Sequence, residues 1–311
     1  MIRNMIALTA ATLAVAGFAA DAHAKGKTFA LIQYNQQVSF FTDITRGAQK
    51  AADAAGDKLL VFDANNSAQQ QDNAFDTYIQ QKVDGIVIVC VDPDGIMPAV
   101  RAASKAGINV VAVDGILPDG PQASQISVDN YAAGKLIGDF YVDYVKKNMG
   151  GKATIGVVGA LNSPLQNTRQ KGFDDVVKPA GGVTQVGIVD GHNVPEQAMS
   201  AAENLFTGNP DMQTIYATGE PALVGAIAAA QSQGRTDKIK IFGWDLSPQA
   251  VGAIDAGYLV GVVQQDPYQE GQKAVEALDT LASGGTVEKA IKVPVTIVTK
   301  ANVDQFRAAF K

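Results

Sequence analysis

The sequence predicts an α/β protein of two similar lobes, each with a parallel β-sheet covered by helices on both faces. Short apolar segments of strand length alternate with longer segments of helical spacing along nearly the whole chain. The strand segments are apolar throughout, which is typical of parallel strands buried on both faces. The alternation restarts at residue 129, and 311 residues are enough for two domains of about 150 residues each.

The first half of the chain is expected to form four strands with helices between them. The run at 29–32 is apolar and of strand length, and the segment after it has helical spacing at Phe41, Ile44, Ala48, Ala51 and Ala52. The other strands expected here are residues 58–62, 85–90 and 109–113, separated by helices that end near residues 82 and 106. A connection rich in Pro and Gly then leads to a crossing strand at 125–128.

The second half repeats this pattern. Its expected strands are residues 153–158, 183–189, 213–217, 238–242 and 259–265. Its expected helices are residues 129–148, 168–178, 195–206, 221–233, 248–256 and 268–282. A single late strand at 293–299 and a last short helix complete the prediction.

Three crossings, near Val128, Gln265 and Thr296, are expected to connect the lobes. Two lobes joined by a few strands form a hinge around a cleft. The predicted N-terminal lobe comprises residues 25–128 with 266–295, and the predicted C-terminal lobe comprises residues 129–265 with 296–311.

Residues 1–24 have the pattern of a cleavable secretory signal peptide. Arg3 precedes a run of apolar and small residues at 5–20, and an A-x-A pattern closes it, so cleavage is expected after Ala24. A transmembrane anchor is the alternative, but the run is short for a bilayer and ends in a cleavage pattern. The residue directly after the cleavage site is Lys25 and not a cysteine, which argues against a lipid anchor.

Composition and charge exclude several classes of function. An apolar fraction of 47% and a charged fraction of 18% are those of an ordinary globular protein. The net charge of −6, without a basic run, argues against binding to nucleic acid. Cys90 is the only cysteine and lies in an apolar strand, so we expect an inert buried thiol and no internal disulfide.

The residues that catalysis requires are scarce. His192 is the only histidine after the signal peptide, and it stands in a loop where it either faces a ligand or is simply solvated. No G-x-S-x-G segment is present, and the sequence at 150–153 lacks the upstream glycine and the hydroxyl of a phosphate loop. With a single cysteine and this histidine, no zinc site is expected, and no cofactor.

The loop after the first strand is a candidate binding site. It carries amide side chains and Tyr34, and it leads into the adjacent rings of Phe40 and Phe41. In an open α/β sheet, ligands bind at the carboxyl ends of the strands. Amides and phenols exchange hydrogen bonds with hydroxyl groups, and flat rings cover the C–H face of a sugar. The alternative is that the two phenylalanine rings only pack in the core.

Four isolated polar residues stand out elsewhere in the chain. Three of them end predicted strands, and the fourth begins a predicted helix of the second half. Asp114 ends the fourth strand, Asp245 ends the strand IFGWD, Gln265 ends LVGVVQQ, and Arg169 begins a helix. A carboxylate accepts from two hydroxyls, and a guanidinium donates to two oxygens, which together make a recognition site for a polyhydroxylated molecule. Taken singly, each aspartate is also explained as a helix cap or turn former.

With these residues in hand, the chain resembles the periplasmic binding proteins of the ribose- and galactose-binding type, which serve sugar ABC transporters. The resemblance runs from about Thr28 to Thr299. The segments that carry it are FFTDITRGAQKAA, DGIVI, the strand-end Asp114, SVDNYAAGKLIGD, RQKGF, Gly243-Trp244-Asp245 and Gln265-Asp266-Pro267. It implies two Rossmann-like lobes of the type I periplasmic binding protein fold that close on one sugar, a periplasmic location, and delivery to a membrane permease.

The resemblance also implies ligand positions in both lobes. These are Tyr34, Val38, Phe40, Phe41, Asp114, Gly115, Arg169, Asn193, Gly219, Asp245 and Gln265. Four depart from the ribose-binding pattern, because Val38 replaces an amide, Gly115 an arginine, Asn193 an aromatic residue and Gly219 an asparagine. At Val38, Gly115 and Gly219 a ribose hydroxyl would lose its hydrogen-bond partner, at about 1–3 kcal/mol of binding free energy for each buried group. This loss argues against ribose itself. Candidates for replacement contacts to another sugar or polyol are Gln33, Tyr34, Asn35, Asn193 and Glu220.

The leading hypothesis is therefore a monomeric periplasmic protein that binds a small neutral sugar or polyol, without catalysis, and delivers it to an ABC permease. A ligand sensor that presents its closed form to a membrane chemoreceptor or kinase is an alternative on the same fold. An exported enzyme acting on sugars is an alternative from a different class, with Asp114 and Asp245 as its carboxylate pair. Lactose-repressor-type regulators share the fold, but an export signal here takes the place of their DNA-binding segment.

Overall fold

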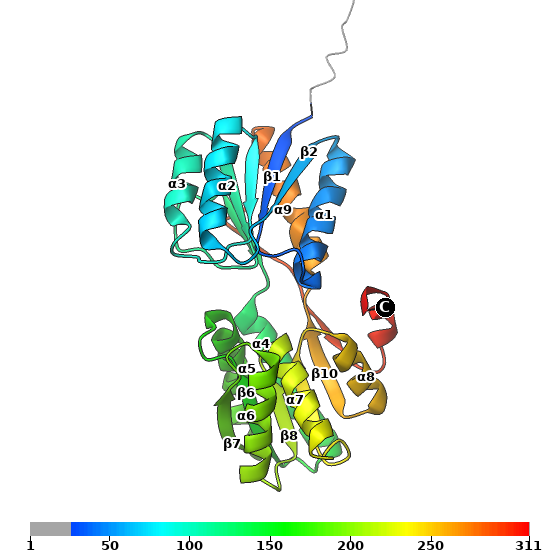
Figure 1. Ribbon diagram of the computed structural model, residues 1–311. Coiled ribbons are helices and arrows are strands. Elements are labelled where there is room, and N and C mark those ends of the chain that lie inside the picture. The colour runs from blue at the N-terminus through cyan, green and yellow to red at the C-terminus, as the bar shows by residue number, and fades with distance from the viewer. Residues whose placement is uncertain (1–25, 311) are drawn as a thin grey trace, which may run out of the picture.

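The computed structural model describes residues 26–310, which form two α/β lobes joined end to end by three short crossings (Figure 1). The crossings lie between β5 and α4, between β10 and α9, and between β11 and β12. The expected signal peptide, residues 1–24, lies outside the described residues. No helix within 26–310 is long and apolar enough to cross a membrane.

The N-terminal lobe is built on a six-stranded parallel sheet in the order β11-β5-β4-β3-β1-β2. Its strands are β1 (Thr28–Gln33), β2 (Lys58–Asp63), β3 (Gly85–Ile88), β4 (Asn109–Val113), β5 (Ser124–Ser127) and β11 (Ala290–Lys292). Its helices are α1 (Ser39–Ala55), α2 (Ala68–Gln81), α3 (Met97–Lys105) and α9 (Pro267–Ala282). Helices α1 and α9 share one buried cluster with the sheet, and α2 and α3 share the cluster on the other face.

The C-terminal lobe repeats this plan with a six-stranded sheet in the order β12-β10-β9-β8-β6-β7. Its strands are β6 (Ala153–Gly159), β7 (Val183–Asp190), β8 (Thr214–Ala217), β9 (Lys240–Trp244), β10 (Leu259–Gln264) and β12 (Thr296–Val298). Its helices are α4 (Asn130–Asn148), α5 (Pro164–Ala180), α6 (Pro195–Gly208), α7 (Glu220–Ser232) and α8 (Pro248–Ala256). Two 3₁₀ turns, η1 (Val303–Gln305) and η2 (Arg307–Phe310), end the described chain. Helices α4 and α5 cover one face of the sheet, and α6, α7 and α8 cover the other.

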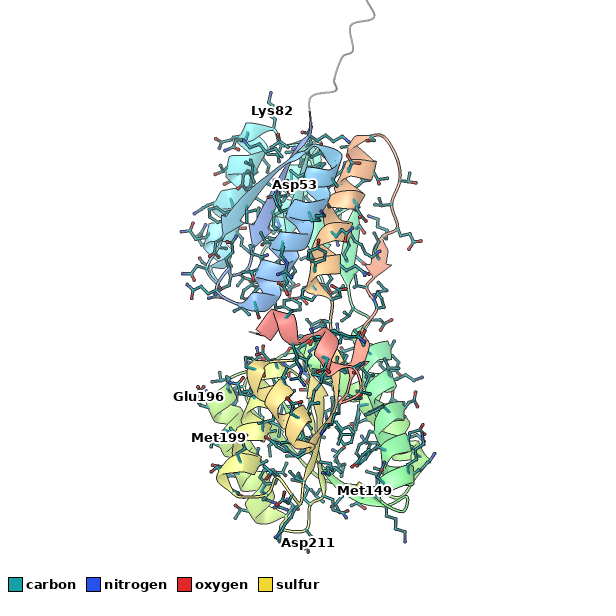
Figure 2. The ribbon with its side chains drawn as sticks, turned by 90° about the vertical axis from the view of Figure 1, so that its right-hand side faces the viewer. Asp53, Lys82, Met149, Glu196, Met199 and Asp211 are labelled. Atoms are coloured by element: carbon teal, nitrogen blue, oxygen red, sulfur yellow. The ribbon has the colours of Figure 1, made fainter. Side chains whose placement is uncertain are left out.

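The carboxyl ends of both sets of parallel strands face the other lobe. The chain crosses directly after the carboxyl ends of β5 and β10, and the parallel neighbours of these strands end at the same edge. Figure 2 shows the opposite ends far away, with Lys82, just before β3, at the outer end of one lobe and Asp211, just before β8, at the outer end of the other. Polar residues that follow strands in the two lobes therefore lie toward the same central region.

Helix α9 is held tightly against α1, and this contact fixes the start of α9 in the N-terminal lobe. A Cβ atom on Gly271 would lie 1.9 Å from the carbonyl oxygen of Ile44, and one on Gly47 would lie 1.9 Å from that of Tyr268. Only glycine allows two helix backbones to approach this closely.

The expected single strand at 293–299 is wrong. Two short strands take its place, with β11 parallel to β5 in one sheet and β12 antiparallel to β10 in the other. Pro294 lies between them, and a proline has no N–H to continue a ladder of hydrogen bonds. The third crossing is therefore residues 293–295, and the second sheet has one antiparallel edge.

Three smaller expectations also differ from the structure. Helix α5 begins at Pro164 and not at residue 168, because Ser163 caps it and accepts a hydrogen bond from the N–H of Gln166 at 3.4 Å. Arg169 thus lies in the second turn of this helix and not at its start. Strand β9 ends at Trp244, two residues later than expected. The segment expected to cross as a strand is β5, which belongs wholly to the first sheet.

The α1–α9 contact gives a stability prediction. Replacing glycine by alanine inside a helix ordinarily stabilises it by about 1 kcal/mol. We expect Gly271→Ala to do the opposite and lower the unfolding free energy by about 1–3 kcal/mol, since the two helices must move apart. Urea denaturation measures both effects. The matched control is Gly252→Ala in α8, where a Cβ atom meets nothing within 4 Å, and this variant should be more stable. Stabilisation by both substitutions would contradict the close approach.

Candidate functional site

Asp114 and Asp245 occupy equivalent positions in the two lobes. Asp114 follows β4 and Asp245 follows β9, and these two strands hold the same place in their sheets. Both residues have left-handed backbones, with φ of 61° and 59°. Non-glycine residues rarely adopt this conformation, and it is concentrated at functional sites.

The same local structure supports both aspartates. The N–H of Asp114 donates to the carbonyl of Ile126 at 2.9 Å, and that of Asp245 donates to the carbonyl of Val263 at 2.8 Å. Oε1 of Gln125 and of Gln264, one in each adjacent strand, then accepts from a backbone N–H just beyond the turn, that of Leu117 or of Leu246. Each sheet therefore turns one carboxylate outward at its carboxyl edge.

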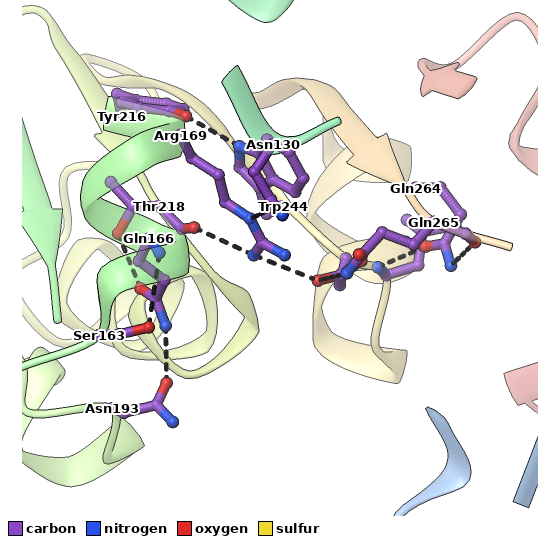
Figure 3. Close-up of polar contacts among 12 residues, drawn as sticks. Asn130, Ser163, Gln166, Arg169, Asn193, Tyr216, Thr218, Trp244, Gln264 and Gln265 are labelled. Carbon is purple, nitrogen blue, oxygen red and sulfur yellow. Dashed lines mark hydrogen bonds and ion pairs between the residues drawn. The ribbon is translucent and has the colours of Figure 1, made fainter. Parts of the chain in front are cut away.

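Arg169 is a buried cation next to Asp245. Its Nη1 lies 3.9 Å from Oδ2 of Asp245 and donates to the carbonyl of Thr218 at 3.4 Å, and its Nε donates to Oδ1 of Asn130 at 2.7 Å (Figure 3). The guanidinium carbon lies 3.9 Å from the centre of the Trp244 ring, a cation–π distance. These contacts hold the guanidinium in one orientation.

The expected residues of the C-terminal lobe form one connected network with Arg169. Nε2 of Gln265 donates to both carboxylate oxygens of Asp245, at 3.1 and 3.0 Å. On the other side of Arg169, the Thr218 hydroxyl donates to Oε1 of Gln166, and Nε2 of Gln166 donates to Oδ1 of Asn193, both at 2.8 Å. Figure 3 shows this chain running from Asn193 to Gln265.

The expected aromatic residues of the N-terminal lobe form a second group. The rings of Tyr34 and Phe41 are stacked with centroids 4.9 Å apart, and Phe40 meets Phe41 edge to face at 5.4 Å. All three are half-buried and pack against the α1–α9 side of the core. They are thus both core residues and part of the surface at the carboxyl edge of the sheet.

Two of the suggested replacement residues are already engaged within their own lobe. Gln33 is fully buried, and its amide bonds the carbonyl of Phe41, the hydroxyl of Thr45 and the N–H of Tyr34. Asn35 is 6% exposed and donates to Oδ1 of Asn66 at 3.1 Å. The polar atoms of Gln33 join strand, loop and helix, and those of Asn35 join two loops, whereas a direct contact of either side chain with a ligand stays a prediction.

Neighbouring side chains occupy the space beside the two glycines that replace polar residues. A Cβ atom on Gly115 would lie 2.8 Å from Sγ of Cys90, and one on Gly219 would lie 2.7 Å from the amide of Gln166. The expected burial of Cys90 is confirmed, and this burial, with the charge of Asp114 adding to it, raises the pKa of the thiol to about 12. His192 is exposed and its Nδ1 lies 3.3 Å from Oδ2 of Asp190.

The carboxyl groups of the two lobes share one electrostatic environment. Burial raises the pKa of Asp114 to about 6, Arg169 opposes this rise, and the charge of Asp245 adds to it. Burial also raises the pKa of Asp245, again opposed by Arg169. Asp114 belongs to the N-terminal lobe, and Asp245 and Arg169 belong to the C-terminal lobe. The charges of these three residues therefore interact across the boundary between the lobes.

Glu270 is a further member of this group that the sequence analysis did not identify. It lies in the first turn of α9, is fully buried, and its two carboxylate oxygens have no hydrogen-bond partner within residues 26–310. Burial raises its pKa well above the usual 4.5, Asp114, Asp245 and Asp266 add to the rise, and Arg169 opposes it. A glutamate in a first helical turn usually serves the helix dipole. The available signal was its spacing of four from Ala274, which places it on the buried face.

The arrangement offers donors, acceptors and aromatic faces, which are the elements of recognition. Within the described residues, no group of His, Cys, Asp and Glu is placed to hold a metal ion.

Comparison with known proteins gives consistent matches. The family model described as a periplasmic binding protein domain matches residues 29–286. The ribose import binding protein of Escherichia coli (strain K12) is 30% identical over 309 residues, which cover 96% of this chain and 99% of that protein. A xylitol-binding protein of Mycolicibacterium smegmatis is 27% identical over 268 residues, covering 86% and 75%.

Solved structures match at similar length. An ABC transporter solute-binding protein from Mycobacterium smegmatis with bound glycerol has a TM-score of 0.78 and 30% identity, covering 90% of this chain and 96% of that chain. An ABC transporter solute-binding protein from Agrobacterium vitis with bound D-fucose has a TM-score of 0.77 and 26% identity, covering 90% and 98%.

The burial of Glu270 predicts a pH-dependent stability. A carboxyl whose folded-state pKa is raised keeps its proton longer in the folded than in the unfolded chain, so stability falls as pH rises above about 4. We expect Glu270→Gln to remove this loss. Its melting temperature should match that of the wild type at pH 4 and exceed it by about 2–4 °C, or roughly 1 kcal/mol, at pH 8.

The control for this experiment is Glu276→Gln, an exposed position on the same helix, which should change the melting temperature little at either pH. Equal pH profiles for the wild type and Glu270→Gln would show that Glu270 is not held in a neutral, buried form.

Proposed function

The chain belongs to the periplasmic binding protein family, and we propose that it captures a small neutral sugar or polyol between its two lobes and delivers it to an ABC importer. The observation that carries this proposal is the network from Asn193 through Arg169 to Gln265, which lies at the edge of one lobe that faces the other. Asp114 and the aromatic group of Tyr34, Phe40 and Phe41 lie at the corresponding edge of the other lobe.

Each part of this site suits a hydroxyl-rich molecule. Asp114 and Asp245 accept hydrogen bonds from hydroxyls, and the guanidinium of Arg169 donates to ring or hydroxyl oxygens. The half-buried rings of Tyr34 and Phe41 are suited to the C–H face of a sugar. A chemical step would need a nucleophile beside a base, whereas the groups proposed for this site are hydrogen-bond donors, acceptors and aromatic rings. We therefore propose that the protein binds its ligand without catalysis.

The relatives support a sugar or polyol without indicating which one. The names of two relatives include ribose and xylitol, and the solved relatives carry glycerol and D-fucose. Gly115 and Gly219 carry no polar side chains, and Cys90 and Gln166 fill the adjacent space. We therefore propose a ligand whose hydroxyl pattern differs from that of ribose.

Capture requires the lobes to move, and the crossings are the natural hinge. We propose lobes of residues 25–128 with 266–295 and 129–265 with 296–311, bending at 128–129, 265–266 and 293–295. A monomer in the periplasm, exported by residues 1–24, fits this role and the names of the relatives.

The function is tested by isothermal titration calorimetry of the folded protein against D-ribose, D-arabinose, D-allose, D-tagatose, D-fucose, xylitol and glycerol. At least one of these should bind with a dissociation constant in the micromolar range or below. The absence of binding to all of them, with a cooperative melting transition intact, would contradict a sugar or polyol ligand.

The site assignment predicts the effect of removing either aspartate. Asp114→Ala and Asp245→Ala should each weaken binding of the best ligand by at least about 2 kcal/mol, roughly 30-fold in dissociation constant, because ligand hydroxyls lose their acceptor. Asp237→Ala, at an exposed position, is the control and should bind as the wild type does. Unchanged affinity in both site variants would place the ligand elsewhere.

A further inference from the structure

We propose that Gln166 is a positioning residue that sets ligand specificity by holding the side-chain amide of Asn193 with its NH₂ group exposed and its carbonyl oxygen withheld. This inference rests on the proposed function, because it assigns a hydrogen-bonding polarity to one position of that site. Gln166 itself is 7% exposed and does not offer its polar atoms to a ligand.

The Gln166 amide has one hydrogen-bond partner at each end. The hydroxyl of Thr218, which is 1% exposed, donates to Oε1 of Gln166 at 2.8 Å. The NH₂ end of Gln166 faces the other way, where Nε2 donates to Oδ1 of Asn193 at 2.8 Å. The carbonyl oxygen of Asn193 is thereby engaged. Asn193 is exposed, and Figure 3 shows its Nδ2 directed away from Gln166.

Gly219 makes room for this arrangement. A Cβ atom at position 219 would lie 2.7 Å from both Cδ and Nε2 of Gln166. The φ of Gly219 is −164°, an extended conformation that any residue adopts, so a side chain here would meet the Gln166 amide and not a backbone constraint. Gln166 thus occupies the space that a side chain at 219 would fill.

The backbone around Asn193 is also fixed. His192 and Asn193 have φ of 52° and 60°, a conformation that asparagine tolerates better than most residues. Oδ1 of Asp190 accepts from the N–H of His192 at 2.8 Å and from that of Leu161 at 3.1 Å. These hydrogen bonds connect the loop after β7 to the loop before α5. Helix α5 carries Gln166 in its first turn.

The N-terminal lobe contains the same arrangement at the equivalent strand, β2. Asn65 and Asn66 have φ of 46° and 63°, and Oδ1 of Asp63 accepts from the N–H of Asn65 at 2.9 Å. Oδ1 of Asn66 accepts from the amide of Asn35 at 3.1 Å. In both loops the side-chain carbonyl of an asparagine accepts a hydrogen bond within its own lobe, and the NH₂ group points away from that bond. Because the two loops differ in sequence, the shared geometry indicates that this asparagine orientation is a regular feature of the carboxyl edge.

The consequence is a fixed division of roles in the site. Asp114 and Asp245 only accept hydrogen bonds, whereas Asn193 only donates through its side chain. The ligand atom at Asn193 is therefore an acceptor, namely a ring oxygen, a carbonyl oxygen or a hydroxyl whose proton is directed elsewhere. A ligand that presents a donor there leaves two donors facing each other.

The test reverses this polarity with Gln166→Glu. The introduced carboxylate still accepts from Thr218, but it no longer donates, so Asn193 must turn its NH₂ group inward and its carbonyl oxygen outward. At pH 8, where the carboxylate is ionised, we expect binding to weaken at least 10-fold in calorimetry. The probe is whichever of D-ribose, D-arabinose, D-allose, D-tagatose, D-fucose, xylitol and glycerol binds the wild type most tightly.

A double-mutant cycle separates polarity from charge and folding. In an Asn193→Ala background, Gln166→Glu should change the affinity less than 2-fold, because no amide remains to be turned. The inference is overturned if Gln166→Glu leaves the wild-type affinity unchanged or weakens binding equally in both backgrounds. No binding of any probe to the folded wild type would instead overturn the proposed function and this inference together.

Gly219→Ala provides a second route if Gln166→Glu lowers stability. Its Cβ atom should displace Gln166 and free the Asn193 amide to rotate, with a smaller loss of affinity than Gln166→Glu causes. This loss should also vanish in the Asn193→Ala background. A loss that persists there would show that position 219 acts by shape alone and would contradict the role of Gln166.

Discussion

The buried guanidinium of Arg169 is the interaction on which the candidate site depends. It is the one lysine or arginine among the buried residues of the described chain, and it opposes the raised pKa values of Asp114, Asp245 and Glu270. Burying carboxylates without a compensating charge is costly. Trp244, Asn130 and Thr218 hold this cation in place, so its position beside Asp245 is fixed by the packing of the C-terminal lobe.

The doubled fold explains why acidic groups from distant parts of the sequence meet. Each sheet turns an aspartate outward at the end of its equivalent strand, and the crossings set these carboxyl edges toward each other. Arg169 comes from one lobe and acts on carboxyl groups from both, since Asp114 and Glu270 belong to elements of the N-terminal lobe. A ligand that bridges the lobes would add hydroxyls to an arrangement that already links them electrostatically.

The fold and most of the candidate site follow from local sequence features. Apolar strand-length segments marked the sheets, and Asp114 and Asp245 were recognisable because polar residues at strand ends stand out against buried strands. The apolar pattern at 293–299 predicts one strand, whereas Pro294, which cannot continue a ladder of hydrogen bonds, separates two short strands. Helical spacing predicts a start of α5 at residue 168, whereas Ser163 caps the helix before Pro164 and adds the first turn, which carries Gln166.

Gln166 and Glu270 could not be identified in the same way, because their roles depend on what lies beside them. The proposed role of Gln166 depends on its contact with Gly219 and on its hydrogen bond with the hydroxyl of Thr218. Spacing along the chain reveals neither contact. Glu270 has the sequence position of an ordinary helix-start acid, and apart from its spacing from Ala274 nothing in the sequence indicates that it is fully buried.

The most direct measurement is a crystal structure of the protein with its tightest-binding sugar or polyol. The account predicts one ligand between the lobes, with its hydroxyls within hydrogen-bond distance of Asp114 from one lobe and of Arg169 and Asp245 from the other. A ligand that contacts a single lobe, or that binds away from these three residues, would contradict it.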